Sequence, residues 1–189
     1  ITDDGTLDGS LSQLYLETAR YWLSRFTWEP DRNQYSSFFV KGPDEYCGAA
    51  VNNTFTNYLA RHNVRLALRH AAMDEAERER LQHFCEHVTL LYDPQRHLYL
   101  QDELFDRLEP MPDGHAQGEP LYKSVCFDRM QRYRALKQAD LVQLMTMFPD
   151  DFSDGEKRAV WDRYEPLTVH DSSLSFGIHA LLAFRLGLE

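Results

Sequence analysis

The sequence has no long hydrophobic run and few cysteines. No apolar stretch approaches the roughly 20 residues of a membrane-spanning helix, and no signal-peptide pattern opens the chain. The cysteines Cys47, Cys85 and Cys126 are odd in number and form no CxxC pair. We therefore expect a cytoplasmic protein with reduced thiols that does not bind a membrane.

Positive charge is also scarce, since the formal net charge is −10. Such a charge argues against nucleic acid or any other nonspecific polyanion as a partner. Of the 20 basic residues only four are lysines, which makes each lysine worth inspecting. The 43% hydrophobic and 26% charged content is typical of a globular protein, and the length is near that of one domain.

The eight histidines raise the question of a metal site. His83 and His87 stand four residues apart on an expected helix and could chelate a cation. No nearby third ligand accompanies them, so we expect no metal site.

Apolar periodicity predicts six helices and an all-α fold with antiparallel neighbours. The expected ranges are 10–25, 53–72, 74–92, 128–147, 153–164 and 172–188. Residues 27–46 predict a short ribbon or extended loop, and residues 93–124 a long loop with one strand at 98–100. Loops of this length are often functional. Ser153 with Glu156 three residues later predicts a capping box.

Three polar clusters contain residues that packing alone would not select. They are GPDEY at 42–46 followed by NNTFTN at 52–57, KQAD at 137–140 inside an expected helix, and TVHDSSLS at 168–175. Each has a purely structural interpretation as well: an exposed turn at Asp44 and Glu45, an exposed pair of Lys137 and Asp140, and a helix N-cap at Asp171 or Ser172.

Taken together and in order, these strings resemble the catalytic domain of glycoside hydrolase family 65. ETARYW at 17–22 is similar to the ETARFW helix of that family, and residues 149–153 match its PDxFS turn. The resemblance covers nearly the whole chain. It implies an (α/α)6 barrel with long active-site loops, of which residues 1–189 supply about half.

The same resemblance implies that the sequence is a piece of a longer polypeptide. The N-terminal β-sandwich, the helical linker, the first barrel helices and the C-terminal β segment of the family are absent. The full-length protein is expected to form a homodimer.

The activity implied by the resemblance is inverting phosphorolysis of an α-glucosidic disaccharide such as maltose, trehalose, kojibiose or nigerose. Inorganic phosphate is the co-substrate, the products are β-glucose 1-phosphate and a sugar, and no cofactor is required. Inversion needs an acid at the leaving oxygen and a nucleophile on the opposite face. Glu45 is implied as this acid, with Asp44 as competitor and as a substrate-binding residue. We expect the pKa of Glu45 to be raised.

The remaining implied site residues bind the two substrates. Lys137 and Gln138 are implied to hold the glucosyl hydroxyls, although Lys137 could instead form a salt bridge within its helix. His170, Ser172 and Ser173 are implied to bind phosphate, because hydroxyls and free N–H groups at a helix N-terminus bind anions.

Two departures from the family leave the acceptor sugar undefined. Cys47-Gly48 stands where the family commonly has His-Glu, and residues 104–123 match no one disaccharide. A hydrolase using Glu165 or Asp171 as base, and a noncatalytic half-barrel, are the alternatives. The intact HDSSLS string argues against the first. The joint retention of Glu45, Lys137, Gln138 and His170 argues against the second.

Overall fold

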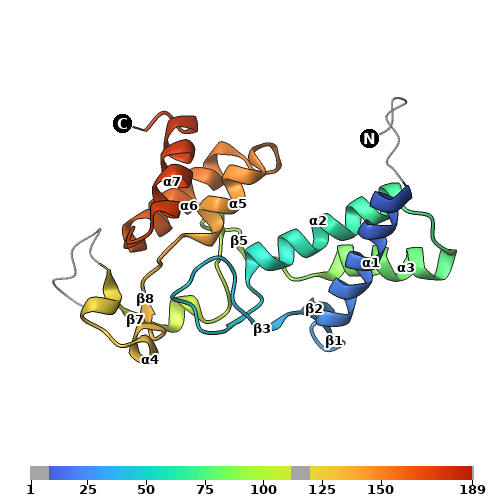
Figure 1. Ribbon diagram of the computed structural model, residues 1–189, viewed down its shortest axis with the longest axis horizontal. Helices are drawn as coiled ribbons and strands as arrows, with labels where there is room; N and C mark the ends of the chain where they lie inside the picture. The colour runs from blue at the N-terminus through green and yellow to red at the C-terminus, as the bar shows by residue number, and fades with distance from the viewer. Residues whose placement is uncertain (1–8, 112–119, 189) are drawn as a thin grey trace. The chain divides into compact units, whose positions relative to one another are not determined.

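The computed structural model describes residues 9–111 and 120–188 (Figure 1). The chain forms two compact units, which are considered separately below. The first unit comprises Ile1–Phe38 and Thr56–Leu90, and the second comprises Phe39–Phe55 and Leu91–Glu189. Helices predominate in both, as the sequence predicts.

The first unit consists of helices around an apolar core. Its elements are α1 (Gly9–Arg25), most of α2 (Thr54–His70), α3 (Glu75–His87) and the antiparallel hairpin of β1 (Thr27–Glu29) and β2 (Gln34–Ser36). The buried core includes Leu16, Ala19, Val64, Leu81 and Phe84. These side chains recur at helical spacing, so the three helices bury one stripe each.

Helix α3 begins where the sequence predicts and ends earlier. The side chain of Asp74 caps it by accepting a 2.8 Å hydrogen bond from the backbone of Glu77. The predicted end near residue 92 is wrong. Val88 forms a β-bridge with Tyr35, and the N–H of Thr89 donates to the Tyr35 carbonyl. The chain after His87 therefore pairs with a segment distant in sequence and does not continue the helix.

The second unit combines short strands and helices. Its strands are most of β3 (Phe38–Val40), then β4 (Ala50–Val51), β5 (Tyr92–Asp93), β6 (Leu98–Tyr99), β7 (Glu109–Pro110) and β8 (Tyr133–Arg134). Its α-helices are α4 (Phe127–Met130), α5 (Asp140–Met147), α6 (Asp154–Tyr164) and α7 (Ser173–Arg185). Single 3-10 turns are η1 (Phe105–Arg107), η2 (Leu121–Lys123), η3 (Pro149–Asp151) and η4 (Glu165–Leu167). Helix α5 packs against both α6 and α7 (Figure 1).

Several local predictions are confirmed in this unit. Ser153 and Glu156 form the predicted capping box at the start of α6. The predicted strand near residue 98 is β6, which pairs with β5 in an antiparallel hairpin. Part of the predicted long loop, residues 112–119, lies outside the described residues.

The single helix predicted over residues 128–147 is wrong. The structure has α4, then the strand β8, then an extended segment, and only from Asp140 the helix α5. The N–H of Leu136 donates to the Leu167 carbonyl at 2.9 Å, and the Leu136 carbonyl accepts from Val169 at 2.8 Å. Because these groups are bonded to a distant segment, they cannot join a helical ladder.

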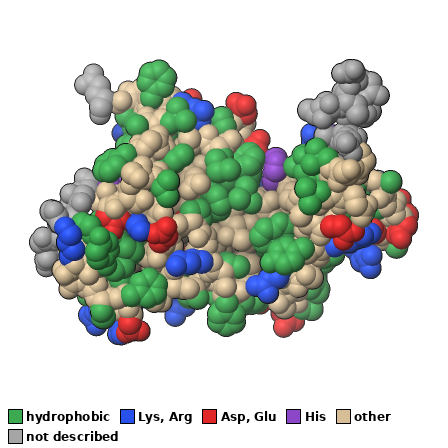
Figure 2. All heavy atoms as spheres, viewed as in Figure 1, with side chains coloured by type: hydrophobic (Ala, Val, Ile, Leu, Met, Phe, Trp, Pro, Cys, Tyr) green, Lys and Arg blue, Asp and Glu red, His purple; other side chains and the backbone are tan. Residues whose placement is uncertain are grey.

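The structure has seven α-helices within residues 9–111 and 120–188, one more than the six predicted, because α4 and α5 replace one predicted helix. The predicted helical class is confirmed, and the described residues also contain four two-stranded sheets. None of the helices described is long and apolar enough to cross a membrane. Figure 2 shows acidic, basic and hydrophobic side chains interspersed on one face of the molecule.

Candidate functional site

The GPDEY segment makes a turn that requires its glycine. Gly42 has φ +76°, which L side chains rarely adopt. A Cβ atom at Gly42 would lie 2.4 Å from Oδ2 of Asp140 and 2.8 Å from Nδ2 of Asn53. The turn therefore closes onto these two side chains only because position 42 has no side chain.

Asp44 is the buried member of the carboxylate pair in this turn. Its Oδ1 accepts hydrogen bonds from the backbone N–H groups of Lys137 at 2.9 Å and Tyr46 at 3.1 Å. Its own N–H donates to Oδ1 of Asp140 at 2.7 Å, and Asn53 donates to the other oxygen of Asp140 at 2.7 Å. Asp44 is only 2% exposed, so the interpretation of a solvated turn is wrong for this residue.

Burial controls the protonation of these two carboxyls. It raises the pKa of Asp44 to about 7, against the opposing effect of the backbone N–H donors from Lys137, Tyr46 and Gln138. Burial and the neighbouring Asp44 charge raise the pKa of Asp140 well above its usual value. The pair therefore holds a proton under conditions where exposed aspartates are ionised.

Glu45 lies in a different environment. Its side chain is 51% exposed and forms an ion pair with the ammonium group of Lys137. The hydrogen bond from Lys137 lowers the pKa of Glu45, with smaller contributions in the same direction from Gln138 and Lys41. The expectation that this pKa is raised is thus wrong for the protein without bound substrate, because a cation faces the carboxyl.

Lys137 and its neighbours stand on the extended segment before α5. Ala139 has extended backbone angles, and Asp140 is the first residue of the helix. The interpretation of a salt bridge within the helix is therefore wrong, since Lys137 pairs with Glu45 from another segment. The interpretation of Lys137 and Asp140 as an exposed pair is also wrong, because Asp140 is fully buried.

A cavity of about 610 Å³ brings predicted site residues from all three clusters together. Glu45, Gln138 and Ser173 line it, along with Pro43, Gln143, Leu174, Gly177 and Ile178. Oε1 of Gln138 is buried and has no hydrogen-bond partner among the described residues. The cavity wall therefore combines a carboxyl, an amide with an unused acceptor, and the first turn of α7.

Ser172 and Ser173 begin helix α7 in different ways. Ser172 is the N-cap, and its Oγ accepts from the N–H of Leu174 at 3.3 Å. The structural interpretation of this residue is thereby confirmed, and its phosphate role stays a prediction. Ser173 is exposed and lines the cavity.

His170 lies in the turn that precedes α7, two residues before Ser172. Its ring is buried, with Nδ1 2.8 Å from Oγ of Ser175 and Nε2 3.1 Å from Oε1 of Glu165. Its φ of +57° marks a strained turn. Because both ring nitrogens are engaged, the His170 side chain offers no free donor to the cavity, and its phosphate role stays a prediction.

Glu165, His170 and His179 form a cluster that was not predicted from the sequence. Nδ1 of His179 bonds the second oxygen of Glu165, and one potential ligand atom of each residue lies within 4.8 Å of the others. Burial tends to raise the pKa of Glu165, but the two histidines outweigh it and lower the pKa. The spacing E-x4-H-x8-H around the HDSSLS string is the sequence pattern that could have indicated this cluster.

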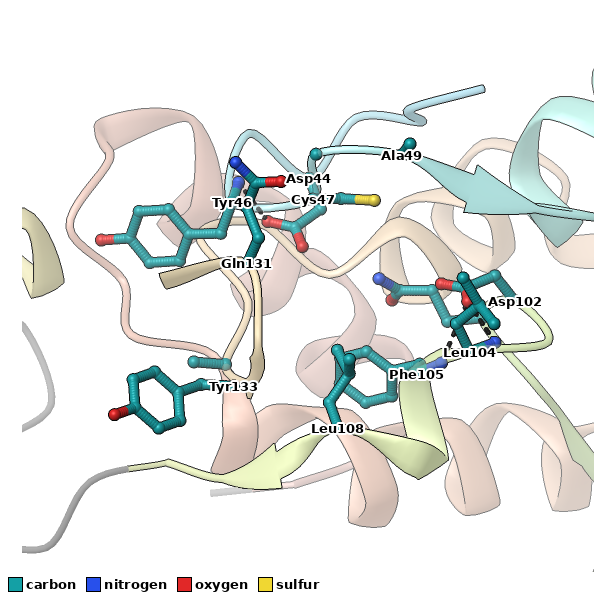
Figure 3. Close-up of a pocket in the computed structure, with 13 residues that line it drawn as sticks. Asp44, Tyr46, Cys47, Ala49, Asp102, Leu104, Phe105, Leu108, Gln131 and Tyr133 are labelled. Carbon is teal, nitrogen blue, oxygen red and sulfur yellow. Dashed lines mark hydrogen bonds between the residues drawn. The ribbon is translucent and has the colours of Figure 1, made fainter. Parts of the chain in front are cut away.

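A smaller cavity of about 130 Å³ lies beside the turn (Figure 3). Cys47 and Gly48 line it, together with Gln131 and Tyr133. Burial raises the pKa of the Cys47 thiol to about 12, so it stays protonated. A Cβ atom at Gly48 would lie 1.7 Å from Oε1 of Gln131, so the Gln131 amide occupies the space that a side chain at position 48 would need.

Tyr46 links the turn to the segment before α7. Its hydroxyl donates to the carboxylate of Asp171 and accepts from the N–H of Leu121 at 3.1 Å. The two acidic candidates for a hydrolytic base are therefore both engaged, Asp171 by Tyr46 and Glu165 by two histidines.

The larger cavity thus combines a carboxyl group, two amides and a serine hydroxyl with apolar side chains, within a mostly helical fold. The family model described as the Glycosyl hydrolase family 65 central catalytic domain matches residues 2–189. The chain therefore belongs to glycoside hydrolase family 65, and the resemblance seen in the sequence is confirmed.

Similar proteins include two phosphorylases. A maltose phosphorylase of Bacillus subtilis is 32% identical over 184 residues, covering 90% of this chain and 24% of that protein. A kojibiose phosphorylase of Escherichia coli is 34% identical over 183 residues, covering 93% of this chain and 24% of that protein. The chain thus spans about a quarter of the length of these curated relatives.

A solved structure described as "Putative kojibiose phosphorylase from human microbiome" superposes with a TM-score of 0.81 at 26% identity. The match covers 93% of this chain and 27% of that one.

Proposed function

We propose that this chain forms part of the catalytic centre of an inverting phosphorylase for an α-glucosidic disaccharide. Inorganic phosphate attacks the anomeric carbon and β-glucose 1-phosphate is released. The similarity to maltose and kojibiose phosphorylases supports this reaction class. The chain contributes one part of an (α/α)6 barrel in a longer cytoplasmic, homodimeric protein.

The observation that carries the proposal is the 610 Å³ cavity, which Glu45, Gln138 and Ser173 line together. These residues come from three sequence clusters, and each supplies one requirement of the reaction. Glu45 supplies the proton donor, Gln138 a planar amide for sugar hydroxyls, and Ser173 a hydroxyl at a helix N-terminus for phosphate. Asp44 is buried beside the turn and acts by positioning Glu45.

Glu45 must gain a proton before it can act as an acid, although its pKa is lowered by Lys137 in the substrate-free protein. We propose that Lys137 moves from Glu45 to the glucosyl hydroxyls when the sugar binds. The sugar also excludes water from Glu45, and both changes raise the pKa of the carboxyl. Sugar binding then prepares the acid for proton transfer to the leaving oxygen.

Phosphate lies, in this proposal, at the first turn of α7. The hydroxyls of Ser172 and Ser173 and the positive end of the α7 helix dipole stabilise the anion without a formal positive charge. His170 contributes by fixing the turn that precedes Ser172, because its ring nitrogens contact Ser175 and Glu165. No cofactor is required, since phosphate itself is the nucleophile.

The hydrolase alternative needs a free carboxylate on the phosphate side. Asp171 is bonded by Tyr46 and Glu165 by two histidines, which disfavours either as a base that activates water. The noncatalytic alternative gives no reason for Glu45 and Gln138 to share a cavity.

The test is the reaction of the full-length protein with maltose, kojibiose, trehalose and nigerose, each with and without phosphate. Proton NMR of the first product separates β-glucose 1-phosphate from the α anomer by its anomeric coupling. We expect cleavage only with phosphate and the β product. Equal cleavage without phosphate to free glucose would establish the hydrolase, and no cleavage of any α-glucoside would support the noncatalytic alternative.

A further inference from the structure

Two buried imidazoles flank one carboxylate at the start of the last helix. His170 is 7% exposed and His179 is 4% exposed. Nε2 of His170 and Nδ1 of His179 each contact a different oxygen of Glu165, and the rings are T-shaped with centroids 4.6 Å apart. Within the described parts of the chain, this is the one group of three or more ligand-type residues whose donor atoms lie within 4.8 Å.

We propose that Glu165, His170 and His179 bind a divalent transition metal ion, with Zn²⁺ the best fit. Imidazole nitrogen and carboxylate oxygen are the usual protein ligands of Zn²⁺ alongside thiolate. Three protein ligands leave a fourth position of the tetrahedron for water or a small anion. The site is separate from the 610 Å³ cavity, whose lining includes none of these three residues.

The surroundings of His170 suit coordination through Nε2. Its Nδ1 lies 2.8 Å from the hydroxyl of Ser175, which is 1% exposed. The serine hydroxyl can accept a hydrogen bond from Nδ1–H, and it then fixes the tautomer in which Nε2 presents a lone pair. Such outer hydrogen bonds are the usual way in which proteins orient a metal-binding histidine.

His179 is free to adopt the matching tautomer. Its Nε2 is buried and makes no hydrogen bond to the described residues, so no partner there opposes a proton on that atom. With the proton on Nε2, Nδ1 presents its lone pair toward Glu165. Phe176 stacks on His170 and Trp161 lies beside His179, so aromatic rings shield the two ligands from water.

The proposed ion would connect three consecutive parts of the fold. Glu165 begins η4, His170 occupies the left-handed turn, and His179 lies two turns inside α7. Binding in the folded state alone stabilises the fold by mass action. We expect the ion to stabilise the turn that presents Ser172.

The experiment uses tag-free full-length protein stripped with a chelator. Titration with Co²⁺ is followed by visible absorption, which reports tetrahedral coordination, and Zn²⁺ is then added to displace it. We expect one equivalent bound at this site, and a melting temperature that rises with Zn²⁺ and falls with chelator. Absence of a tetrahedral Co²⁺ spectrum in the folded wild-type protein would overturn the proposal.

Variants separate this site from other histidines. His179→Gln removes a ligand, and Ser175→Ala keeps all three ligands while removing the orienting hydroxyl. We expect Ser175→Ala to weaken Co²⁺ affinity about 10–100-fold and His179→Gln to weaken it at least as much. The matched control is His83→Gln with His87→Gln, whose stacked rings lie 4.2 Å apart in the other unit. Loss of binding in the control with retention in Ser175→Ala and His179→Gln would assign the metal elsewhere.

Discussion

The backbone N–H of Asp44 donates a 2.7 Å hydrogen bond to the side chain of Asp140, 96 residues later in the sequence. In return, Oδ1 of Asp44 accepts from the N–H of Lys137. These two bonds hold the GPDEY turn against the segment before α5. They place Glu45 beside Lys137, so the buried carboxyls determine where the exposed one lies.

The first prediction concerns the acid. In the full-length enzyme, Glu45→Gln should lower kcat at least about 10²–10⁴-fold while glucose binding changes little, because a proton donor is lost and a similar shape is kept. Steady-state kinetics and calorimetric glucose binding measure the two effects. The matched control is Glu109→Gln, which changes an exposed glutamate of β7 that does not line the cavity. Retention of more than about a tenth of the activity would remove the acid role from Glu45.

The second prediction concerns the cation that faces Glu45. Replacing Lys137 by Met should raise the pKa of Glu45, because the hydrogen bond and charge that lower it are removed. Carbon-13 NMR of labelled glutamate carboxyls, assigned with Glu45→Gln, follows this titration. Lys157→Met, which removes a lysine paired with Asp154, is the control. An unchanged Glu45 titration in Lys137→Met would contradict the ion pair.

The third prediction separates phosphate binding from helix capping. Ser173→Ala should raise the phosphate KM by roughly tenfold or more with little change in Tm, since a hydrogen bond to a charged group is worth about 1.5–3 kcal/mol. Ser172→Ala removes an N-cap and should also lower stability by about 0.5–2 kcal/mol. The disaccharide KM should change less in both.

Ser153→Ala is the control for the third prediction, because it removes the cap of α6 and only stability should fall. Kinetics and thermal melting are measured on the same preparations. If both α7 variants lose only stability, the two serines are structural and phosphate binds elsewhere.

The fourth prediction concerns pH and the buried pair. The folded-state pKa of Asp44 is raised to about 7 from an ordinary value of 3.8. Between these pH values the folded protein keeps a proton that the unfolded chain releases. The contribution of Asp44 to stability is therefore fully present below about pH 4 and is lost as pH rises to about 7.

Asp44→Asn tests this relationship, because the amide oxygen can still accept from Lys137 and Tyr46, which both donate to Oδ1. At pH 8 the variant should be more stable than wild type by at least about 1 kcal/mol, or roughly 2–4 °C in Tm, and the difference should shrink near pH 4. Melting curves across this range measure it. Asp128→Asn on exposed α4 is the control, and an equal difference at both pH values would contradict a raised Asp44 pKa.

Features set by neighbouring residues could be predicted from the sequence. The capping box of Ser153 and Glu156, the early part of α3 behind Asp74, and the start of α7 behind Ser172 all depend on contacts within three residues. The ordered motifs also identified the family, because their residue types and order are visible without coordinates.

Features set by distant partners could not be predicted in this way. Residues 137–139 follow a helical pattern in sequence but are not helical, because the backbone of Leu136 bonds to Leu167 and that of Lys137 bonds to Asp44. The lowered pKa of Glu45 likewise depends on a lysine 92 residues away.

The sequence by itself determined the family, the helical class, the helix caps and the candidate site residues. Only the tertiary structure decided that Asp44 is buried while Glu45 is exposed, and that His170 turns away from the cavity toward Glu165. The physical reason is the separation in sequence between the residues that interact. Caps and helical periodicity are encoded within a few residues, whereas burial and charge depend on side chains that folding alone brings together.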